Sequence, residues 1–146
     1  MPTTQRTRTI AAPAGEVWEL VSDPHHLPRW WPRVARVEAV EVDAFTKVYA
    51  SPRGRMVRAD FEVLETDASA LVLRWSQRLQ GTPFARLLSS AVTEVRLHPE
   101  GTATEVTIEL RQALTGIFPR LGASRVRRAA RATLDEALDG LERIVG

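Results

Sequence analysis

The sequence excludes several kinds of functional site by what it lacks. It contains no cysteine, which rules out disulfides, thiolate catalysis and cysteine-based zinc or iron–sulfur centres. No G-x-S-x-G motif occurs. No run approaches the ~20 apolar residues that a membrane-spanning helix needs, and the first ten residues have no apolar segment of signal-peptide type. We therefore predict a cytoplasmic protein without integral membrane association.

Lysine is also almost absent. Lys47 is the sole lysine beside nineteen arginines, and because arginine stays charged at high pH, the pI is near 9.9 although the formal net charge is only +2. A net charge this small is weak evidence for a polyanionic partner, so we expect no nucleic acid. With 44% hydrophobic and 26% charged residues, the composition is typical of one globular domain, spanning residues 1–146.

Histidines offer no convincing metal or catalytic site. His25 and His26 are adjacent, and neighbours on a helix point about 100° apart, which disfavours joint chelation. The third, His98, lies in a predicted turn. A hydrolase triad needs a nucleophile, a base and a carboxylate within hydrogen-bond reach, and these positions do not favour one. We predict no metal, no cofactor and no catalytic residue.

The segment from Pro119 to Gly146 is the longest predicted helix. About 20 helical residues would span roughly 30 Å. A helix of this kind gains most of its stability by burying its apolar stripe against another layer. The apolar residues with helical spacing are Val126, Ala130, Leu134, Ala137, Leu138, Leu141, Ile144 and Val145.

Most of the remaining chain predicts antiparallel strands. In the clearest one, 56–64, Val57, Ala59, Phe61 and Val63 alternate with charged residues. Short turns between the strands favour a meander with one buried face. We therefore predict an α+β fold in which about six to seven strands cover the C-terminal helix. The predicted strands are residues 5–10, 33–45, 47–51, 56–64, 71–76, a run ending at residue 97, and 102–112.

Two short helices are expected between the first two strands. Pro13 suits a helix start, and Ser22-Asp23-Pro24 ends one helix and can begin the next. The stretch IAAPAGEVWELVSDPHHLPRWWPRV, residues 10–34, resembles the opening of the polyketide cyclase/dehydrase and lipid-transport family within the START/Bet v 1-like (SRPBCC) superfamily. The matching residues are Ala12, Pro13, Val17, Trp18, Val21, Asp23, Trp30, Pro32 and Val34.

This resemblance implies a helix-grip fold. In such a fold a curved antiparallel sheet wraps around the long C-terminal helix, and the two short helices close one end. It also implies a cavity between sheet and helix that accepts apolar molecules. The superfamily includes carriers, hormone receptors, aromatic cyclases and chaperone activators, so the resemblance leaves the subfamily open.

Candidate ligand-binding residues follow from the elements that should face the helix. In a helix-grip fold the core and the pocket wall are the same surface at different depths. The segments 84–88 and 115–121 are irregular because of nearby glycines and prolines, and such segments can gate a cavity. The candidates are Trp30, Trp31, Phe61, Trp75, Phe84, Leu88, Phe118, Leu121, Val126, Ala130 and Leu134.

Charged residues share the opposite face of the strands. If Arg58, Asp60 and Glu62 faced the cavity, they could polarise a carbonyl, as an aldol-type cyclisation requires. Burying unpaired charge is costly, however, and the other face of this strand is apolar. We therefore expect a solvated cross-strand ion network, with Arg58 and Arg74 as possible polar anchors for a ligand only if the facing is reversed.

The C-terminal helix carries its charges in an unfavourable order. Its first half is rich in arginine and its second half is acidic, whereas the helix macrodipole prefers the reverse. We expect a solvated face paired with local carboxylates. Sheet carboxylates, an anionic head group or an acidic membrane surface are alternative partners for these arginines. The arginines are Arg120, Arg125, Arg127, Arg128 and Arg131.

Three functions remain after these observations. The first is non-catalytic binding or transport of a small hydrophobic or aromatic molecule. The second is a polyketide-type aromatase/cyclase, which would show two or more ionisable side chains pointing into the cavity. The third is a protein-interaction module, resembling chaperone activators, with a shallow or filled cavity and an exposed basic patch. The ligand, the pathway and the oligomeric state stay open.

Overall fold

The computed structural model describes residues 3–115 and 120–146, with only the backbone of residues 120 and 121. The sheet is formed by β1 (Thr3–Ile10), β2 (Val34–Glu38), β3 (Ala44–Ala50), β4 (Met56–Asp67), β5 (Val72–Gln77), β6 (Leu88–Glu100) and β7 (Ala103–Leu114). The helices are α1 (Ala14–Ser22), η1 (Pro24–His26), α2 (Leu27–Trp30), η2 (Pro83–Arg86) and α3 (Arg120–Val145).

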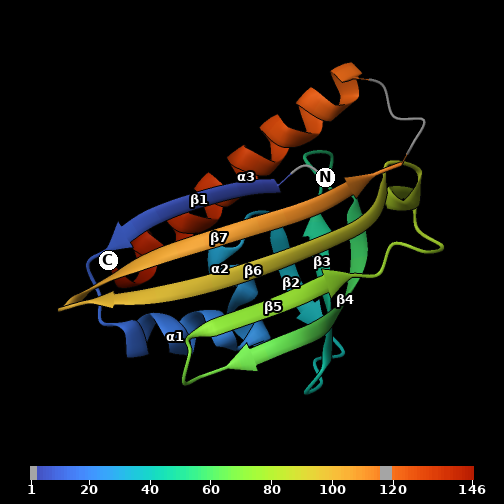
Figure 1. The fold of residues 1–146 in the computed structure, drawn as a ribbon. Coiled ribbons are helices and arrows are strands. Elements are labelled where there is room, and N and C mark those ends of the chain that lie inside the picture. Colours follow the sequence, from blue (N-terminus) through green and yellow to red (C-terminus); the bar gives the residue numbers. More distant parts are fainter. Residues whose placement is uncertain (1–2, 116–119) are drawn as a thin grey trace.

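The predicted α+β helix-grip architecture is confirmed. The seven strands form one antiparallel sheet in the order β1-β7-β6-β5-β4-β3-β2. The curved sheet lies against α3, and the short helices α1 and α2 lie at one end (Figure 1). The first strand pairs with the last along its whole length, from Thr3 opposite Arg111 to Ile10 opposite Thr104. No helix within residues 3–115 and 120–146 is long and apolar enough to cross a membrane.

The predicted single strand over residues 33–45 is wrong in its middle. Strand β2 ends at Glu38, and Ala39 adopts a left-handed backbone with φ 49°. The Glu41 amide then donates to the carbonyl of Ala44, 2.7 Å away, which closes a turn before β3. Val42 is 99% exposed at the tip. The apolar side chain suggested a strand, but the reversal of the backbone places it in solvent.

The apolar stripe of α3 forms the centre of the core, as predicted. Ala130, Leu134, Ala137, Leu138 and Leu141 are all buried, and Leu134 is fully so. A close approach to α2 accompanies this packing. A Cβ atom at Gly140 would lie 2.3 Å from the backbone oxygen of Trp30, closer than any real contact. Glycine at this position therefore allows α2 to pack directly on α3.

The reversed charge order of α3 has a structural explanation. The Arg6 guanidinium lies 3.2 Å from Asp135. Arg8 pairs with Asp139 and lies 3.6 Å from Glu142. The acidic half of the helix is thus matched by two arginines of β1, and these tertiary pairs offset the modest macrodipole penalty.

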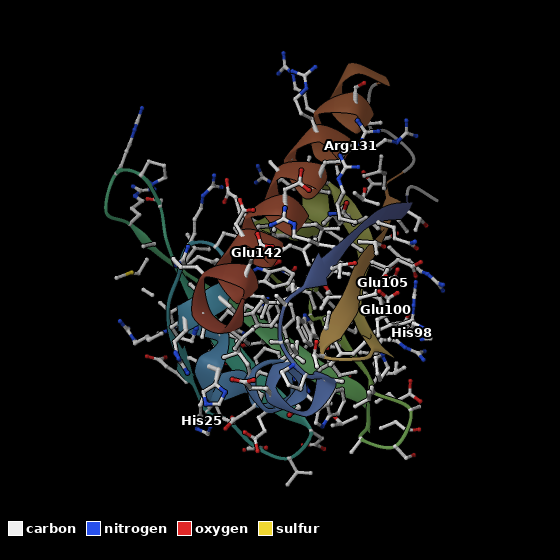
Figure 2. All side chains as sticks on the ribbon, turned by 90° about the vertical axis from the view of Figure 1, so that its left-hand side faces the viewer. His25, His98, Glu100, Glu105, Arg131 and Glu142 are labelled. Carbon is white, nitrogen blue, oxygen red and sulfur yellow. The ribbon has the colours of Figure 1, made fainter. Side chains whose placement is uncertain are left out.

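The basic half of α3 is turned to solvent. Arg125, Arg127, Arg128 and Arg131 are exposed, as expected for a solvated face. The expected pairing with local carboxylates is not found for these four side chains. Arg131 and Glu142 lie on well-separated turns of the helix (Figure 2). Among the described side chains, the ion pairs between α3 and β1 all involve the acidic part of the helix.

A candidate ligand cavity between the sheet and α3

Strand β3 places an unusual set of side chains on the inner face of the sheet. Phe45, Lys47 and Tyr49 are two residues apart, so they share one face. In register with them on β4 lie Phe61, Ala59 and Val57. Lys47 is thus opposite the smallest of the three partners. The lysine is directed toward α3 with aromatic residues before and after it.

A cavity of about 440 Å³ opens beside these residues. Its inner part is formed by buried side chains, including Trp31, Lys47, Phe61 and Thr93, whereas Arg33 and Pro52 at its rim are exposed. The cavity therefore has a closed end and an open end. It is lined by Trp31, Pro32, Arg33, Lys47, Tyr49, Ala50, Ser51, Pro52, Val57, Phe61, Gln77, Phe84, Leu88, Ala91, Thr93, Leu110, Gln112 and Thr133.

Aromatic rings surround the amine of Lys47. Its Nζ lies 4.0 Å from the ring centre of Trp31, 4.6 Å from that of Phe61 and 5.0 Å from that of Trp75. Trp31 packs edge-on against Trp75, with ring centres 5.9 Å apart. Phe45 stacks on Phe61 at 5.3 Å. These contacts hold the rings in place, so the amine is positioned by a rigid cage.

Burial changes the protonation of Lys47. The residue is 1% exposed, and removal of its amine from water holds the pKa well below the ordinary 10.5 of lysine. No carboxylate of the described residues forms an ion pair with it. Protonated lysine is attracted to ring faces, but desolvation dominates here. The cage therefore favours the neutral amine.

Tyr49 is the second ionisable group of the inner face. Burial raises the pKa of its hydroxyl above the ordinary 10.0, and a hydrogen bond with the Trp31 side chain acts in the opposite direction. The Lys47 amine lies 5.8 Å from the Tyr49 ring centre. The phenol therefore stays protonated and can donate a hydrogen bond into the cavity.

The predicted ligand-binding residues divide into several groups. Trp31, Phe61, Phe84 and Leu88 line the cavity. Trp30, Trp75 and Leu134 are buried in the main core instead. Ala130 is buried and Val126 half-buried, but the described residue through which α3 lines the cavity is Thr133. Phe118 and the side chain of Leu121 lie outside the described residues.

The two possible polar anchors face away from the cavity. Arg58 pairs with Glu38 at 3.0 Å, and Arg74 pairs with Glu65 at 2.7 Å. Neither is among the described residues that line the cavity. The alternation of β4 and β5 places them on the outer face, because their neighbours Ala59, Phe61 and Trp75 occupy the inner one. The reversed facing under which Arg58 and Arg74 would anchor a ligand is therefore not found, and the expected cross-strand ion network is.

Sequence reasoning missed the polar groups that do line the cavity. Lys47 and Tyr49 are joined there by Gln77, Thr93 and Gln112. A usable signal was present on β3, where the sole lysine stands between two aromatic residues at strand spacing. The polar residues on the other strands carry no such signal, since threonine and glutamine are equally common on solvent-facing strand positions.

A second hollow, of about 410 Å³, lies between α2 and α3. Arg29, Glu136, Asp139 and Arg143 contribute to its lining. Asp139 is already paired with Arg8. This charged surface hollow fits an apolar molecule less well than the aromatic-lined cavity.

The histidines do not contribute to the cavity. His25 is exposed, and its Nδ1 lies 2.9 Å from Asp23. His98 is exposed near the end of β6, where it faces Glu105 across the ladder. Figure 2 shows His25 and His98 on the outside of the molecule. Neither lines the cavity, in agreement with the expected surface roles.

Comparison with known proteins supports this fold. A family model described as polyketide cyclase/dehydrase and lipid transport matches residues 1–146. The di-domain ARO/CYC BexL from the BE-7585A biosynthetic pathway has a TM-score of 0.83 at 20% identity, covering 98% of this chain and 46% of that one. This chain thus spans about half of BexL. No curated protein matches the sequence.

Two further solved structures match over nearly their whole length. A protein from Thermus thermophilus is 26% identical, with a TM-score of 0.76 and coverage of 97% of this chain and 95% of its own. A START superfamily protein from Mycobacterium smegmatis is 17% identical, with a TM-score of 0.76 and coverage of 98% and 96%. At these identities the common feature is the helix-grip fold.

Proposed function

The chain belongs to the polyketide cyclase/dehydrase and lipid-transport family, and from this premise we propose that it binds a small hydrophobic or aromatic molecule between its sheet and α3. The observation that carries the proposal is the 440 Å³ cavity with its aromatic inner wall. Such a pocket gains affinity from burial of apolar ligand surface, at roughly 25 cal/mol per Å² before entropic losses. Polar groups at the wall would orient the ligand.

Native mass spectrometry of freshly purified protein, beside a denatured control, provides the first test. A reproducible non-covalent adduct is the expected result. The second test is titration with 2-naphthalenemethanol, an apolar probe with one hydroxyl, followed by melting temperature and by the mass of the complex. No adduct and no binding of this probe or of a wider aromatic and lipid library would contradict the proposal.

A cavity-filling variant makes the test specific. Ala91 is buried on β6 and lines the cavity, so Ala91→Phe places a ring in the ligand volume. We expect this change to weaken probe binding by about tenfold or more, which corresponds to about 1.4 kcal/mol. Ala35→Phe, on the exposed surface of β2, is the matched control and should leave binding unchanged. Unfolding curves of both variants show whether either has lost stability.

A polyketide-type cyclase is the second candidate function. It is favoured by one observation, the presence of Lys47 and Tyr49 as two ionisable groups on the cavity wall. A cavity that folds a flexible chain and a polar group that polarises its carbonyl would together promote cyclisation. Turnover of a linear poly-β-ketone by the wild type, lost in Lys47→Met, would distinguish a cyclase from a carrier.

The protein-interaction hypothesis has less support. Its basic patch is present, since four described arginines of α3 are exposed. Its other requirement, a shallow or filled cavity, fits less well with the cavity of about 440 Å³ beside Lys47. We therefore place ligand binding first.

A further inference from the structure

We propose that Lys47 is a nucleophilic amine that captures aldehyde or ketone ligands as a Schiff base inside the cavity. The inference rests on the proposed function, because it assumes that small apolar molecules enter this cavity. It adds the chemical class of the ligand, a carbonyl compound with an apolar or aromatic body. It also gives Lys47 a covalent role, whereas binding by apolar burial alone would not need an amine in the cavity.

The position of the amine is the first argument. Lys47 is 1% exposed at the surface of the protein but lines the cavity together with Tyr49, Phe61 and Thr93. A molecule in the cavity would therefore lie beside the side chain of Lys47, which water scarcely touches. The flat aromatic walls of Trp31 and Phe61 suit a planar ligand next to that amine.

The chemistry of a buried lysine is the second argument. A lysine desolvated in an apolar pocket is an activated nucleophile, because its neutral form has a free electron pair. The low pKa of Lys47 arises from burial. The only other ionisable groups among the described lining residues are Tyr49, on the same strand, and Arg33, at the exposed rim. Neither supplies a negative charge that would keep the amine protonated.

The proposed step balances without an oxidant or reductant. The Nζ electron pair forms a C–N bond to the carbonyl carbon, and the carbonyl π pair moves to oxygen, which takes a proton from the Tyr49 hydroxyl. The nitrogen gives one proton back to Tyr49, which leaves a neutral carbinolamine. Tyr49 then donates its proton to the hydroxyl oxygen, the C–O bond breaks and water leaves, while the nitrogen pair forms the C=N bond. The resulting iminium nitrogen gives its remaining proton to the Tyr49 phenolate, which leaves the neutral imine. One amine and one carbonyl thus give one imine and one water.

An alternative role for Lys47 is that of a counter-ion for a ligand carboxylate. This role requires the protonated amine, which the aromatic cage disfavours when the cavity is empty. It also predicts a different preference among ligands. Three probes with one ring system separate the two roles: 2-naphthaldehyde can be captured, 2-naphthoate can only pair ionically, and 2-naphthalenemethanol can do neither.

The experiment uses the fact that the chain has one lysine. Wild-type protein is incubated with 2-naphthaldehyde and sodium cyanoborohydride, which reduces an imine to a stable secondary amine. Intact mass and peptide mapping then locate the label. We expect one naphthylmethyl group on Lys47, formed near pH 7 at least about tenfold faster than on Nα-acetyl-lysine, because each unit of lowered pKa gives about ten times more neutral amine. The same protein unfolded in urea should lose this advantage.

Two controls identify the site and the cavity. Lys47→Met should retain only the labelling of the N-terminal amine, which peptide mapping distinguishes from the labelling of Lys47. Ala91→Phe, which keeps the lysine but fills the cavity, should slow the labelling of Lys47. Since the wild-type peptide map identifies the labelled residue directly, the test holds even if Lys47→Met folds poorly.

The outcomes separate this inference from the proposed function. If 2-naphthalenemethanol binds but 2-naphthaldehyde labels Lys47 no faster than Nα-acetyl-lysine, the Schiff-base role is overturned and the binding function stands. If 2-naphthoate binds in a Lys47-dependent manner and no labelling occurs, Lys47 is a counter-ion. If none of the three probes binds or reacts, both proposals fail.

Discussion

The two faces of the sheet hold their basic side chains in opposite ways. On the outer face, Arg74, Arg96 and Arg111 each contact a carboxylate of the same or a neighbouring strand, and all three are partly exposed. On the inner face, Lys47 is enclosed by aromatic rings and forms no ion pair with a described residue. The charged groups of the outer face thus stay in contact with water, whereas the amine of the inner face is removed from water.

This difference distinguishes structural from functional charge. Partly exposed ion pairs need little compensation, and each contributes modestly to stability. A buried amine without a carboxylate lowers stability unless it gives up its proton. A methionine or leucine would fill the same space without this cost. The energetic cost of placing a lysine on the inner face supports the proposal that its amine acts on a ligand.

The strongest way to disrupt the inner face is to lift α2 away from α3. We expect Gly140→Ala to lower the free energy of unfolding by about 3 kcal/mol, the upper end for overpacking, because the new Cβ would lie 2.3 Å from the Trp30 oxygen. Urea denaturation measures the change. Alanine is the better helix former by about 1 kcal/mol, so helix propensity alone predicts the opposite sign.

Gly15→Ala is the matched control for this substitution. A Cβ at Gly15 meets nothing within 4 Å, and the residue lies in α1. We expect a gain of about 0.4–1 kcal/mol, mainly from reduced freedom of the unfolded chain. If the two substitutions changed the free energy of unfolding by similar amounts, close packing of α2 on α3 at Gly140 would be contradicted.

The next effect concerns Lys47 itself. Lys47→Met keeps the length of the side chain and removes the amine. We expect it to raise the free energy of unfolding near pH 7 by about 2 kcal/mol, because the wild-type amine must lose its hydration and its proton to be buried. Because burial lowers the pKa of Lys47 in the folded state, the unfolded chain binds a proton there that the folded chain does not. Wild-type stability should then rise with pH toward 10.5, by up to about 1.4 kcal/mol per pH unit.

The advantage of Lys47→Met should accordingly shrink as pH increases. Urea denaturation of both proteins from about pH 6 to about pH 9 measures this convergence, and this range lies below the titration of Tyr49, whose pKa is raised. A difference between the two proteins that is constant over this range would contradict a neutral buried amine.

The smallest effects are expected on the outer face. Glu94 and Glu109 lie directly opposite each other on β6 and β7, and Arg96 pairs with Glu94 and lies 3.9 Å from Glu109. Arg96→Met should lower the free energy of unfolding by about 1–2 kcal/mol, because it leaves two facing carboxylates. Arg58→Met, in a more exposed pair, should cost about 0.5 kcal/mol. Equal costs in urea denaturation would show that the facing carboxylates do not matter.

Much of the fold could be predicted because the relevant patterns are local. The alternation in β4 assigned Ala59 and Phe61 to one face and Arg58 to the other, and the helical spacing of α3 identified Leu134 and Leu138 as core. The exception was the segment 33–45, where apolar residues such as Val42 suggested a continuous strand. The left-handed backbone of Ala39 ends the strand. It could not be predicted, because alanine rarely adopts this conformation and does not indicate a turn.

The candidate site was less predictable. Of the predicted ligand-binding residues, Trp31, Phe61, Phe84 and Leu88 line the cavity, and their contact with a ligand stays a prediction. Trp30 and Trp75 have the same chemistry and belong to the same core as Trp31 and Phe61, but neither lines this cavity. Residue type alone therefore does not separate the two pairs. The sequence did not point to Lys47 as a site residue, because lysine is rarely buried without a partner. Its position between Phe45 and Tyr49 is the one feature of the sequence that indicates an inward-facing lysine.

The sequence by itself determined the layers of this protein, since the periods of two and 3.6 decide which side chains of a strand or helix can be buried together. Only the tertiary structure decided which of those buried positions surround an empty space. The curvature of the sheet, the glycine contact between α2 and α3 and the register that sets Lys47 opposite Ala59 act together across residues distant in the chain. These three features together decide whether an inward side chain meets packed neighbours or a cavity. None of them can be seen in a local sequence pattern.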